Sequence, residues 1–160
     1  MFTGIIQEIG KVAAVKKIGS GIQISIHAPK CASELHIDDS VAISGVCQTV
    51  IARTETNFTV EAVEETLSKT TVNHLRESSL VNVELAMRLN DRLGGHLVLG
   101  HVDGVGSIHS VAQHERSWLI VVRVPEEFLR YVIPVGSIAI DGVSLTVARL
   151  QGQRVTVSII

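Results

Sequence analysis

The sequence predicts an all-β protein with a few short helices, formed by one structural unit that occurs twice. Three observations support this prediction. The chain is rich in Val and Ile but only 3% aromatic, and β-branched side chains favour strands. Several short segments alternate polar and apolar residues, as strands with one buried face do. Finally, the two parts of the sequence align with each other over several segments in the same order.

Local patterns predict the individual strands and helices. Gln23–His27, Ser40–Ser44 and Asn57–Glu61 alternate with a period of two residues and are expected to be strands. Pro125–Tyr131 has a proline and two acidic residues where the first turn of a helix favours them. Glu64–Leu75 is expected to contain another helical turn or two. Short elements of this kind, with frequent glycines between them, are typical of an all-β domain.

The internal repeat is clearest between Asp39–Val50 and Gly136–Val147. These segments lie 97 residues apart and are identical at seven of twelve positions. Shifting Phe2–Val12 by 96 residues places Gly4 on Gly100. A proline that opens a predicted helix and one further strand segment also find counterparts at nearly the same spacing. Four matches in order at nearly one spacing indicate a duplicated unit.

The second copy of the unit is shorter than the first. We divide the chain into a unit of residues 1–92 and a unit of residues 93–160, and Ile160 corresponds to Val63. About 27 residues of the first copy, with a helix and at least one strand, therefore have no counterpart. A barrel without them has an open edge, which is a liability for solubility. We expect the sequence to be a fragment of a longer chain; coverage of the edge by another subunit is the alternative.

Composition and charge exclude several classes of protein. The chain has 160 residues and is 46% hydrophobic, so intrinsic disorder is not expected. A net charge of -2 does not provide the basic surface of a non-specific nucleic-acid binder. No apolar run approaches the roughly 20 residues of a membrane helix, and Met1–Ile6 lacks the features of a secretory signal. Cys31 and Cys47 are too few for a disulfide framework. We expect a soluble cytoplasmic protein without nucleic-acid or membrane partners.

Several motifs along the whole chain together resemble one known family. They are Met1-Phe-Thr-Gly-Ile5, Gly45-Val-Cys-Gln-Thr-Val50, Glu65-Thr-Leu67, Val81-Asn-Val-Glu84, Gly94-Gly-His-Leu-Val-Leu-Gly-His-Val-Asp103 and Gly136-Ser-Ile-Ala-Ile-Asp-Gly-Val-Ser-Leu-Thr-Val147. The Gly-Gly-His and Gly-His-Val-Asp motifs, together with the duplicated Gly-Val-x-x-Thr-Val, are the most specific. On these residues the sequence resembles the riboflavin synthase and lumazine protein family.

The resemblance implies both a fold and a reaction. The fold is a tandem pair of six-stranded Greek-key barrels, of which the second is incomplete here. The reaction is a cofactor-free dismutation of two 6,7-dimethyl-8-ribityllumazine molecules, in which one gives a four-carbon unit to the other. The products are riboflavin and 5-amino-6-ribitylaminouracil. The family enzyme is a homotrimer that assembles around a C-terminal helix, with the N-terminal barrel of one subunit facing the C-terminal barrel of a neighbour.

The resemblance also implies two substrate pockets, each completed by a segment from the other repeat. The first would use Cys47, Gln48, Thr49, Glu61, Ala62, Val63, Glu64, Glu65, Thr66, Gly100, His101 and Val102. The second would use Gly4, Ile5, Ile6, Val135, Ser144, Leu145, Thr146 and Ile160. Glycine turns and hydroxyl-bearing strands provide the polar groups that heterocycle edges and ribityl chains need.

Cys47 and Ser144 are equivalent in the repeat and are the first two candidates for catalysis. A small buried thiol is an equally good interpretation of Cys47 by composition, but the family places a cysteine beside the bound ring. Ser144 and Thr146 alternate on one predicted strand and would face the same side. Without the repeat, two polar groups on a solvated strand face would be the simpler interpretation.

His101 and Ser40 complete the set of catalytic candidates. His101 follows Gly100, where the backbone can approach a ligand closely, and we expect it to handle a proton or to orient the substrate. Ser40 is expected to assist near the first pocket. His96 lies five residues before His101, which is not the spacing of a His-Glu-x-x-His zinc site, so no metal site is expected.

Two positions depart from the family pattern. Gln48 stands where the family usually has Leu, and Val135 stands where it commonly has Lys. A missing cation weakens any electrostatic role in the second pocket. These departures favour an alternative function, that of a lumazine-protein-type chain that holds a lumazine or flavin without turnover. The retained Cys47, His101, Ser144 and Thr146 favour the enzyme, and a purely structural duplicated barrel would leave the motifs unexplained.

Overall fold

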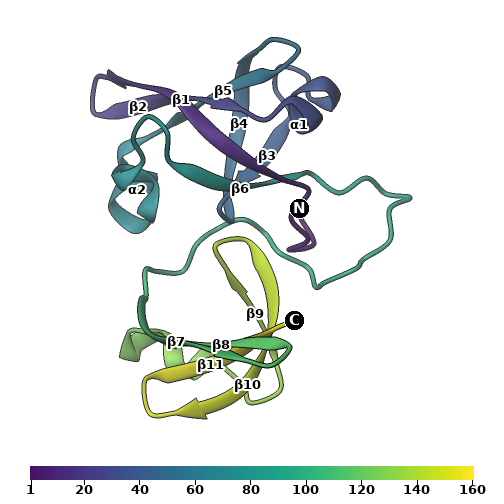
Figure 1. The fold of residues 1–160 in the computed structure, drawn as a ribbon. Helices are drawn as coiled ribbons and strands as arrows, with labels where there is room; N and C mark the ends of the chain where they lie inside the picture. The colour runs from purple at the N-terminus through teal and green to yellow at the C-terminus, as the bar shows by residue number, and fades with distance from the viewer.

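The computed structural model describes residues 1–160, which form two β-sheet units joined by a long irregular segment (Figure 1). The elements of the first unit are β1 Glu8–Ile18, β2 Gly21–His27, α1 Pro29–Glu34, β3 Ser40–Ile43, β4 Val46–Arg53, β5 Asn57–Ala62, α2 Glu64–Lys69, the 3-10 helix η1 Thr71–His74 and β6 Leu80–Leu85. Those of the second are β7 Ser107–His114, β8 Ser117–Arg123, the 3-10 helix η2 Glu126–Tyr131, β9 Ser137–Ile140, β10 Val143–Gln151 and β11 Arg154–Ile159. None of the helices has the length and apolar character needed to cross a membrane.

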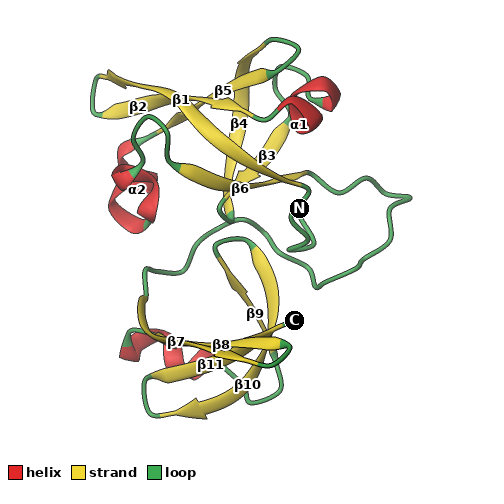
Figure 2. Cartoon of the chain, in the orientation of Figure 1, coloured by secondary structure: helices red, strands yellow, loops and turns green.

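The strands predicted from alternation are confirmed as β2, β3 and β5. The predicted helical turns are also present, and Figure 2 shows them as short pieces at the margins of the two sheets. The segment that follows Pro125 forms a 3-10 helix, and Glu64–Leu75 contains α2 followed by η1. All four helices have six residues or fewer, so they cap the sheets and do not form a layer of their own.

The first unit is a closed antiparallel barrel with the strand order β1-β2-β5-β4-β3-β6. Strand β1 pairs with both β2 and β6, and a bulge between Val12 and Ala14 accompanies its bend. The alternating apolar residues of the strands, among them Ile24, Phe58 and Val83, fill the interior together with residues of α1 and η1 and form a core of 17 buried residues. This unit therefore buries enough apolar surface to form a rigid support for a site.

The second unit has the strand order β7-β8-β11-β10-β9, which repeats the order of the first unit without a counterpart of β6. Its sheet is open, and its edges are β7 and β9. Its core contains only Val147, Val155 and Val157 as buried residues, with partly buried neighbours. The prediction of a duplicated all-β fold with an incomplete second barrel is confirmed. The boundary between residues 92 and 93 remains a prediction.

The two units meet around a local twofold relationship between equivalent residues. Phe2 and Val98 form an antiparallel bridge, in which each N–H donates to the other carbonyl, at 2.8 and 3.0 Å. The β3–β4 and β9–β10 turns also meet, because a Cβ added to Gly45 would lie 2.7 Å from the backbone nitrogen of Gly142. We call residues 2–6, before β1, and residues 98–102, before β7, the lead segments of the two units. Each lead segment therefore lies against the other unit.

Candidate functional site

The Cys47 site forms where the lead segment of the second unit meets the first residues of β4. We define it by Cys47, Gly100, His101 and Val102. The Cys47 N–H donates to the Gly100 carbonyl at 2.8 Å, and Val102 packs against the core of the first barrel. Cys47 is half-buried and His101 is exposed. Cys47 and His101 therefore belong to different repeats, and the hydrogen bond of Cys47 to Gly100 brings their backbones to the same edge of the first barrel.

The Ser144 site is the counterpart in the second unit, and we define it by Ser144, Gly4, Ile5 and His96. The Ser144 N–H donates to the Gly4 carbonyl at 2.7 Å. The Ser144 hydroxyl also lies 2.8 Å from Nδ1 of His96 and forms a hydrogen bond whose direction depends on the tautomer of the ring. The structure thus pairs a hydroxyl with a possible proton acceptor, an arrangement suited to acid–base chemistry.

Gly4 and Gly100 are required by the close approach of the two units. Their φ angles are 76° and 80°, in the left-handed region that favours glycine. A Cβ on Gly4 would lie 2.6 Å from Cβ of Ser144, and one on Gly100 would lie 2.7 Å from Cβ of Cys47. The glycines that align in the repeat therefore have the same role in the two sites.

Each site continues along its strand with hydroxyl groups. Ser40 on β3 pairs with Thr49 on β4, and Ser137 on β9 pairs with Thr146 on β10. Because alternate residues of a strand share a face, Thr49 lies on the face of Cys47 and Thr146 lies on the face of Ser144. Hydroxyl pairs of this kind can donate hydrogen bonds to a polyol chain and accept hydrogen bonds from it.

The lead segments also carry unused backbone donors. The N–H groups of Ile5, Ile6, His101 and Val102 donate to no acceptor within the chain. The carbonyls of Gly4 and Gly100 fix the neighbouring peptide in place, so these donors are held in a defined orientation. Directed N–H groups at the edge of an apolar surface are the usual means of orienting a flat heterocycle.

The segment Glu61–Thr66 contributes mainly through its backbone and its exposed side chains. Ala62 is fully buried in the barrel core and offers no side chain to a ligand. Glu61 is exposed and accepts a hydrogen bond from Gln23 at 3.2 Å. Val63 precedes α2 and is exposed, and Glu64 and Glu65 lie in the first turn of that helix. Thr66 is half-buried at the side of α2.

Three other candidates lie outside the contacts that define the two sites. The Leu145 side chain packs against the core of the second unit. Val135 is 81% exposed, and its N–H donates to the carbonyl of Val147, beside Thr146 along β10. Ile160 is exposed after β11. The structure therefore brings Gly4 and Ser144 together but does not bring Val135 or Ile160 into contact with them.

Gln48 points into the barrel, because Val46, Gln48 and Val50 are the buried positions of β4. Its Nε2 donates to the Cys47 carbonyl at 2.7 Å. Its Oε1 is buried and has no hydrogen-bond partner. Its side chain therefore faces away from the thiol and from Thr49, so Gln48 can reach a ligand on that face only through its backbone.

The two cysteines differ in reactivity because of their surroundings. Cys31 lies in α1 within the barrel core, and burial together with Glu8 raises the pKa of its thiol to about 12. A thiol in this state is inert. Cys47, half-buried at the edge between the units, is the accessible one.

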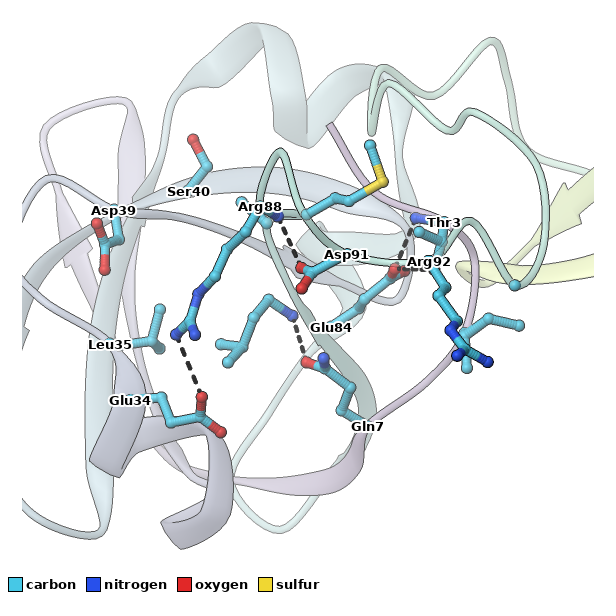
Figure 3. Close-up of a pocket in the computed structure, with 15 residues that line it drawn as sticks. Thr3, Gln7, Glu34, Leu35, Asp39, Ser40, Glu84, Arg88, Asp91 and Arg92 are labelled. Carbon is cyan, nitrogen blue, oxygen red and sulfur yellow. Dashed lines mark hydrogen bonds and ion pairs between the residues drawn. The ribbon is translucent and has the colours of Figure 1, made fainter.

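A cavity of about 550 Å³ lies beside these sites, between the start of β3 and the segment after β6 (Figure 3). Its lining includes Ser40, Ile5 and the mixed charges of Glu34, Arg88 and Arg92. Cys47, His101 and Ser144 do not line it. The cavity therefore borders the Ser144 site only at Ile5, and the Cys47, His101 and Ser144 side chains lie outside it.

Comparison with known proteins agrees with this geometry. The pattern of the Lumazine binding domain matches residues 3–86 and again residues 99–160. A riboflavin synthase of Actinobacillus pleuropneumoniae is 41% identical over 160 residues, which are 100% of this chain and 74% of the relative. A riboflavin synthase of Bacillus amyloliquefaciens is 39% identical with the same coverage.

The chain belongs to the riboflavin synthase family. Solved structures have the same fold: the crystal structure of LumP complexed with riboflavin has a TM-score of 0.91, at 20% identity over 99% of this chain and 86% of that one. LumP complexed with 6,7-dimethyl-8-(1'-D-ribityl) lumazine has a TM-score of 0.88, at 19% identity over 99% of this chain and 85% of that one.

Within this riboflavin synthase family chain, sequence analysis missed one residue of the site. His96 belongs to the Gly-Gly-His motif that supports the resemblance, but it was not assigned to either pocket, whereas its imidazole contacts Ser144. The repeat does not reveal it, since the alignment of the two copies begins after His96. The adjacent Gly94 and Gly95 were the available signal, because a Cβ on Gly95 would lie 2.8 Å from Cβ of Ser144 and 2.1 Å from the Thr3 carbonyl oxygen.

Proposed function

We propose that this chain acts as a riboflavin synthase, a transferase that needs no cofactor. Two 6,7-dimethyl-8-ribityllumazine molecules react, and one gives a four-carbon unit to the other. The products are riboflavin and 5-amino-6-ribitylaminouracil. Together they contain all the atoms and electrons of the two substrates, so the reaction requires no outside oxidant or reductant.

The observation that carries the proposal is the equivalence of the Cys47 and Ser144 sites. Cys47 and Ser144 occupy the same strand position in the two repeats. The N–H of each donates to a glycine carbonyl of the other repeat, at 2.8 Å for Cys47 and 2.7 Å for Ser144. Two identical substrate molecules need two similar pockets, and a duplicated unit provides them. Holding two reactants in register lowers the barrier by up to roughly 7–11 kcal/mol in favourable cases.

The side chains suggest separate duties in the two sites. The proton on the C7 methyl group of one lumazine must leave, and the resulting anion needs hydrogen-bond donors. In the Ser144 site, His96 and Ser144 are the groups able to move a proton. In the Cys47 site, we assign Cys47, His101 and Ser40 to contacts with the ring, and the unused N–H groups of the lead segments would orient it.

The open character of both sites supports an assembly of several chains. We propose that the N-terminal unit, residues 1–92, and the C-terminal unit, residues 93–160, each bind one lumazine, and that units of neighbouring chains face each other. A cytoplasmic homotrimer is the form that the family resemblance favours. Such an arrangement would shield the two bound heterocycles from water, which neither site of the single chain does.

The test is turnover by the purified chain. The lumazine is supplied alone, and riboflavin is followed by its longer-wavelength absorbance. One riboflavin is expected for every two lumazines consumed. S144A is expected to lower kcat by roughly 100-fold or more, as loss of a general acid–base group does. The matched control S110A removes an exposed hydroxyl from β7 of the same sheet and should leave kcat unchanged.

A lumazine-holding protein is the second candidate, and Gln48 and Val135 favour it because both depart from the enzyme pattern. This function predicts tight binding of one lumazine, which remains intact after prolonged incubation. Absence of both binding and turnover would contradict the two candidate functions together.

A further inference from the structure

Glu84 is a buried carboxylate to which sequence analysis gave no role. It lies on β6 with a relative exposure of 3%. Val81 and Val83 point into the barrel core, so Glu84 lies on the outer face of β6, beneath the N-terminal segment. No ion pair includes Glu84. A charge buried in this way is costly unless hydrogen bonds compensate it.

The compensation comes entirely from two residues of the N-terminal segment. Oε1 of Glu84 accepts hydrogen bonds from the Thr3 N–H at 2.6 Å and from the Thr3 hydroxyl at 2.7 Å. Oε2 accepts from the Gly4 N–H at 3.0 Å. Figure 3 shows Glu84 and Thr3 side by side, with the hydrogen bonds between these two residues drawn. Hydrogen bonds to a carboxylate are short and strong, so they hold this peptide firmly.

The carbonyls of the same two residues bind the other unit. The Thr3 carbonyl accepts from the His96 N–H at 3.1 Å, and the Gly4 carbonyl accepts from the Ser144 N–H at 2.7 Å. All four backbone polar groups of Thr3 and Gly4 are therefore used, two by Glu84 and two by the residues whose side chains form the Ser144–His96 hydrogen bond.

We propose that Glu84 is a positioning residue for the Ser144 site. Its carboxylate holds the Thr3–Gly4 peptide, and this peptide sets the position of Ser144 relative to His96. A residue of the first barrel thus controls a site of the second unit. The ligand arm of the following test rests on the proposed function, whereas the geometric arm does not.

The test compares E84Q with the matched control E8Q in the full chain. Gln has the size of Glu, but its NH₂ group is a donor and would face a donor of Thr3 or Gly4, so a hydrogen bond is lost there. Glu8 also accepts two backbone N–H groups, those of Cys31 at 2.7 Å and Lys30 at 3.3 Å, in the same barrel. E8Q therefore weakens the barrel in a similar way without touching the Thr3–Gly4 peptide.

The geometric arm uses NMR of ¹⁵N-histidine-labelled protein, with the ring signals assigned by H96Q and H101Q. E84Q is expected to shift the His96 ring signals and to leave those of His101 in place, whereas E8Q should leave both unchanged. Equal shifts of His96 and His101, or no shift of His96, would overturn the proposal. If E84Q does not fold, T3V removes only the hydroxyl donor, and the same comparison of His96 with His101 decides.

The ligand arm titrates 6,7-dimethyl-8-ribityllumazine into each variant. E84Q should weaken binding roughly tenfold or more at the site that S144A also weakens, as loss of a charge-assisted hydrogen bond does. At the Cys47 site, E84Q should bind the lumazine with the same affinity as E8Q does. Equal weakening at both sites would overturn the proposal. If the wild-type chain binds no lumazine, the proposed function fails, and the histidine signals still decide the role of Glu84.

Discussion

Gln48 introduces an amide into the interior of the first barrel, where its neighbours Val46 and Val50 are hydrocarbon. Its Nε2 has a partner in the Cys47 carbonyl, but its buried Oε1 has none. An unsatisfied buried acceptor retains the full cost of its desolvation, about 1–3 kcal/mol. This residue is therefore a local weak point in an otherwise apolar core.

Q48L is expected to raise the free energy of unfolding by about 1–2 kcal/mol, because it removes the unpaired oxygen and retains the volume of the side chain. Urea unfolding of the purified chain measures the change. Q113L, at an exposed position of β7, is the matched control and should give no gain. A loss of stability in Q48L would indicate that the amide oxygen has a partner after all.

Val135 combines two unfavourable features, because it is 81% exposed and has a φ of 64°. A β-branched residue is strained in this left-handed region. V135Q removes the branch at Cβ without adding a charge. V135K also removes the branch and adds a cation beside Thr146. V135K is therefore expected to bind lumazine several-fold more tightly than V135Q at low salt, with the difference shrinking at high salt. Equal affinities in titrations of the two variants would show that a cation has no role here.

At the scale of the elements, the β3–β4 and β9–β10 turns support each other. Gly45 and Gly142 both have a φ of 82°, and each would place a Cβ 2.7 Å from the backbone nitrogen of the other. Any side chain at these positions must push the two turns apart. The contact between the units therefore depends on the absence of two side chains.

G45A is expected to destabilise the chain by about 3 kcal/mol or more, since it adds overpacking to an unfavourable φ. G19A is the matched control: Gly19 also has a positive φ, of 59°, but nothing lies within 4 Å of an added Cβ. G19A should therefore show only the conformational cost, about 1–2 kcal/mol. Thermal unfolding measures both, and equal losses in the two variants would contradict the role of the turn contact.

Asp141 belongs to the same turn, and burial raises the pKa of its carboxyl above the ordinary value of 3.8. The folded state therefore holds this proton more tightly than the unfolded state does. Its contribution favours folding below pH 3.8 and is lost as the pH rises through the raised pKa. D141N, which cannot ionise, should thus be more stable than the wild type at neutral pH, and the difference should vanish near pH 3.

The control for this prediction is D38N. Asp38 also has a positive φ, of 74°, in a turn of the first unit, so the substitution tests the conformational effect of Asn outside the Asp141 turn. Urea unfolding across the pH range measures both variants. A gain that does not change with pH in D141N, or an equal gain in D38N, would contradict the assignment to burial of the carboxylate.

At the scale of the whole molecule, the two units differ in how much they bury. The closed barrel has a core of 17 buried residues, whereas the open sheet has a core of three. Amide hydrogens of β2 and β5 should therefore exchange more slowly than those of β8 and β11 in the purified chain. Hydrogen exchange followed by mass spectrometry measures this, and uniform protection of the two units would contradict it.

The sequence was sufficient to predict the duplicated fold and the pairing of Gly4 with Ser144 and of Gly100 with Cys47. The repeat made the duplicated fold predictable, because equivalent positions support each other, whereas the two crossed pairings followed from the resemblance to the family. The roles of His96 and Glu84 were not predictable, since neither residue has a counterpart in the aligned repeat. Their importance depends on contacts across 48 and 81 residues of chain, which local patterns do not encode.

The crossing of the lead segments has a consequence for how such a gene can be divided. Met1–Ile6 belongs to the first unit by sequence, yet its Gly4 carbonyl closes the Ser144 site, and Gly100 does the same for Cys47. Separately expressed halves would each lack one wall of their own pocket and regain it only from the other half. When recombination exchanges one half of the gene between relatives, Gly4 must therefore still fit against Ser144, and Gly100 must still fit against Cys47.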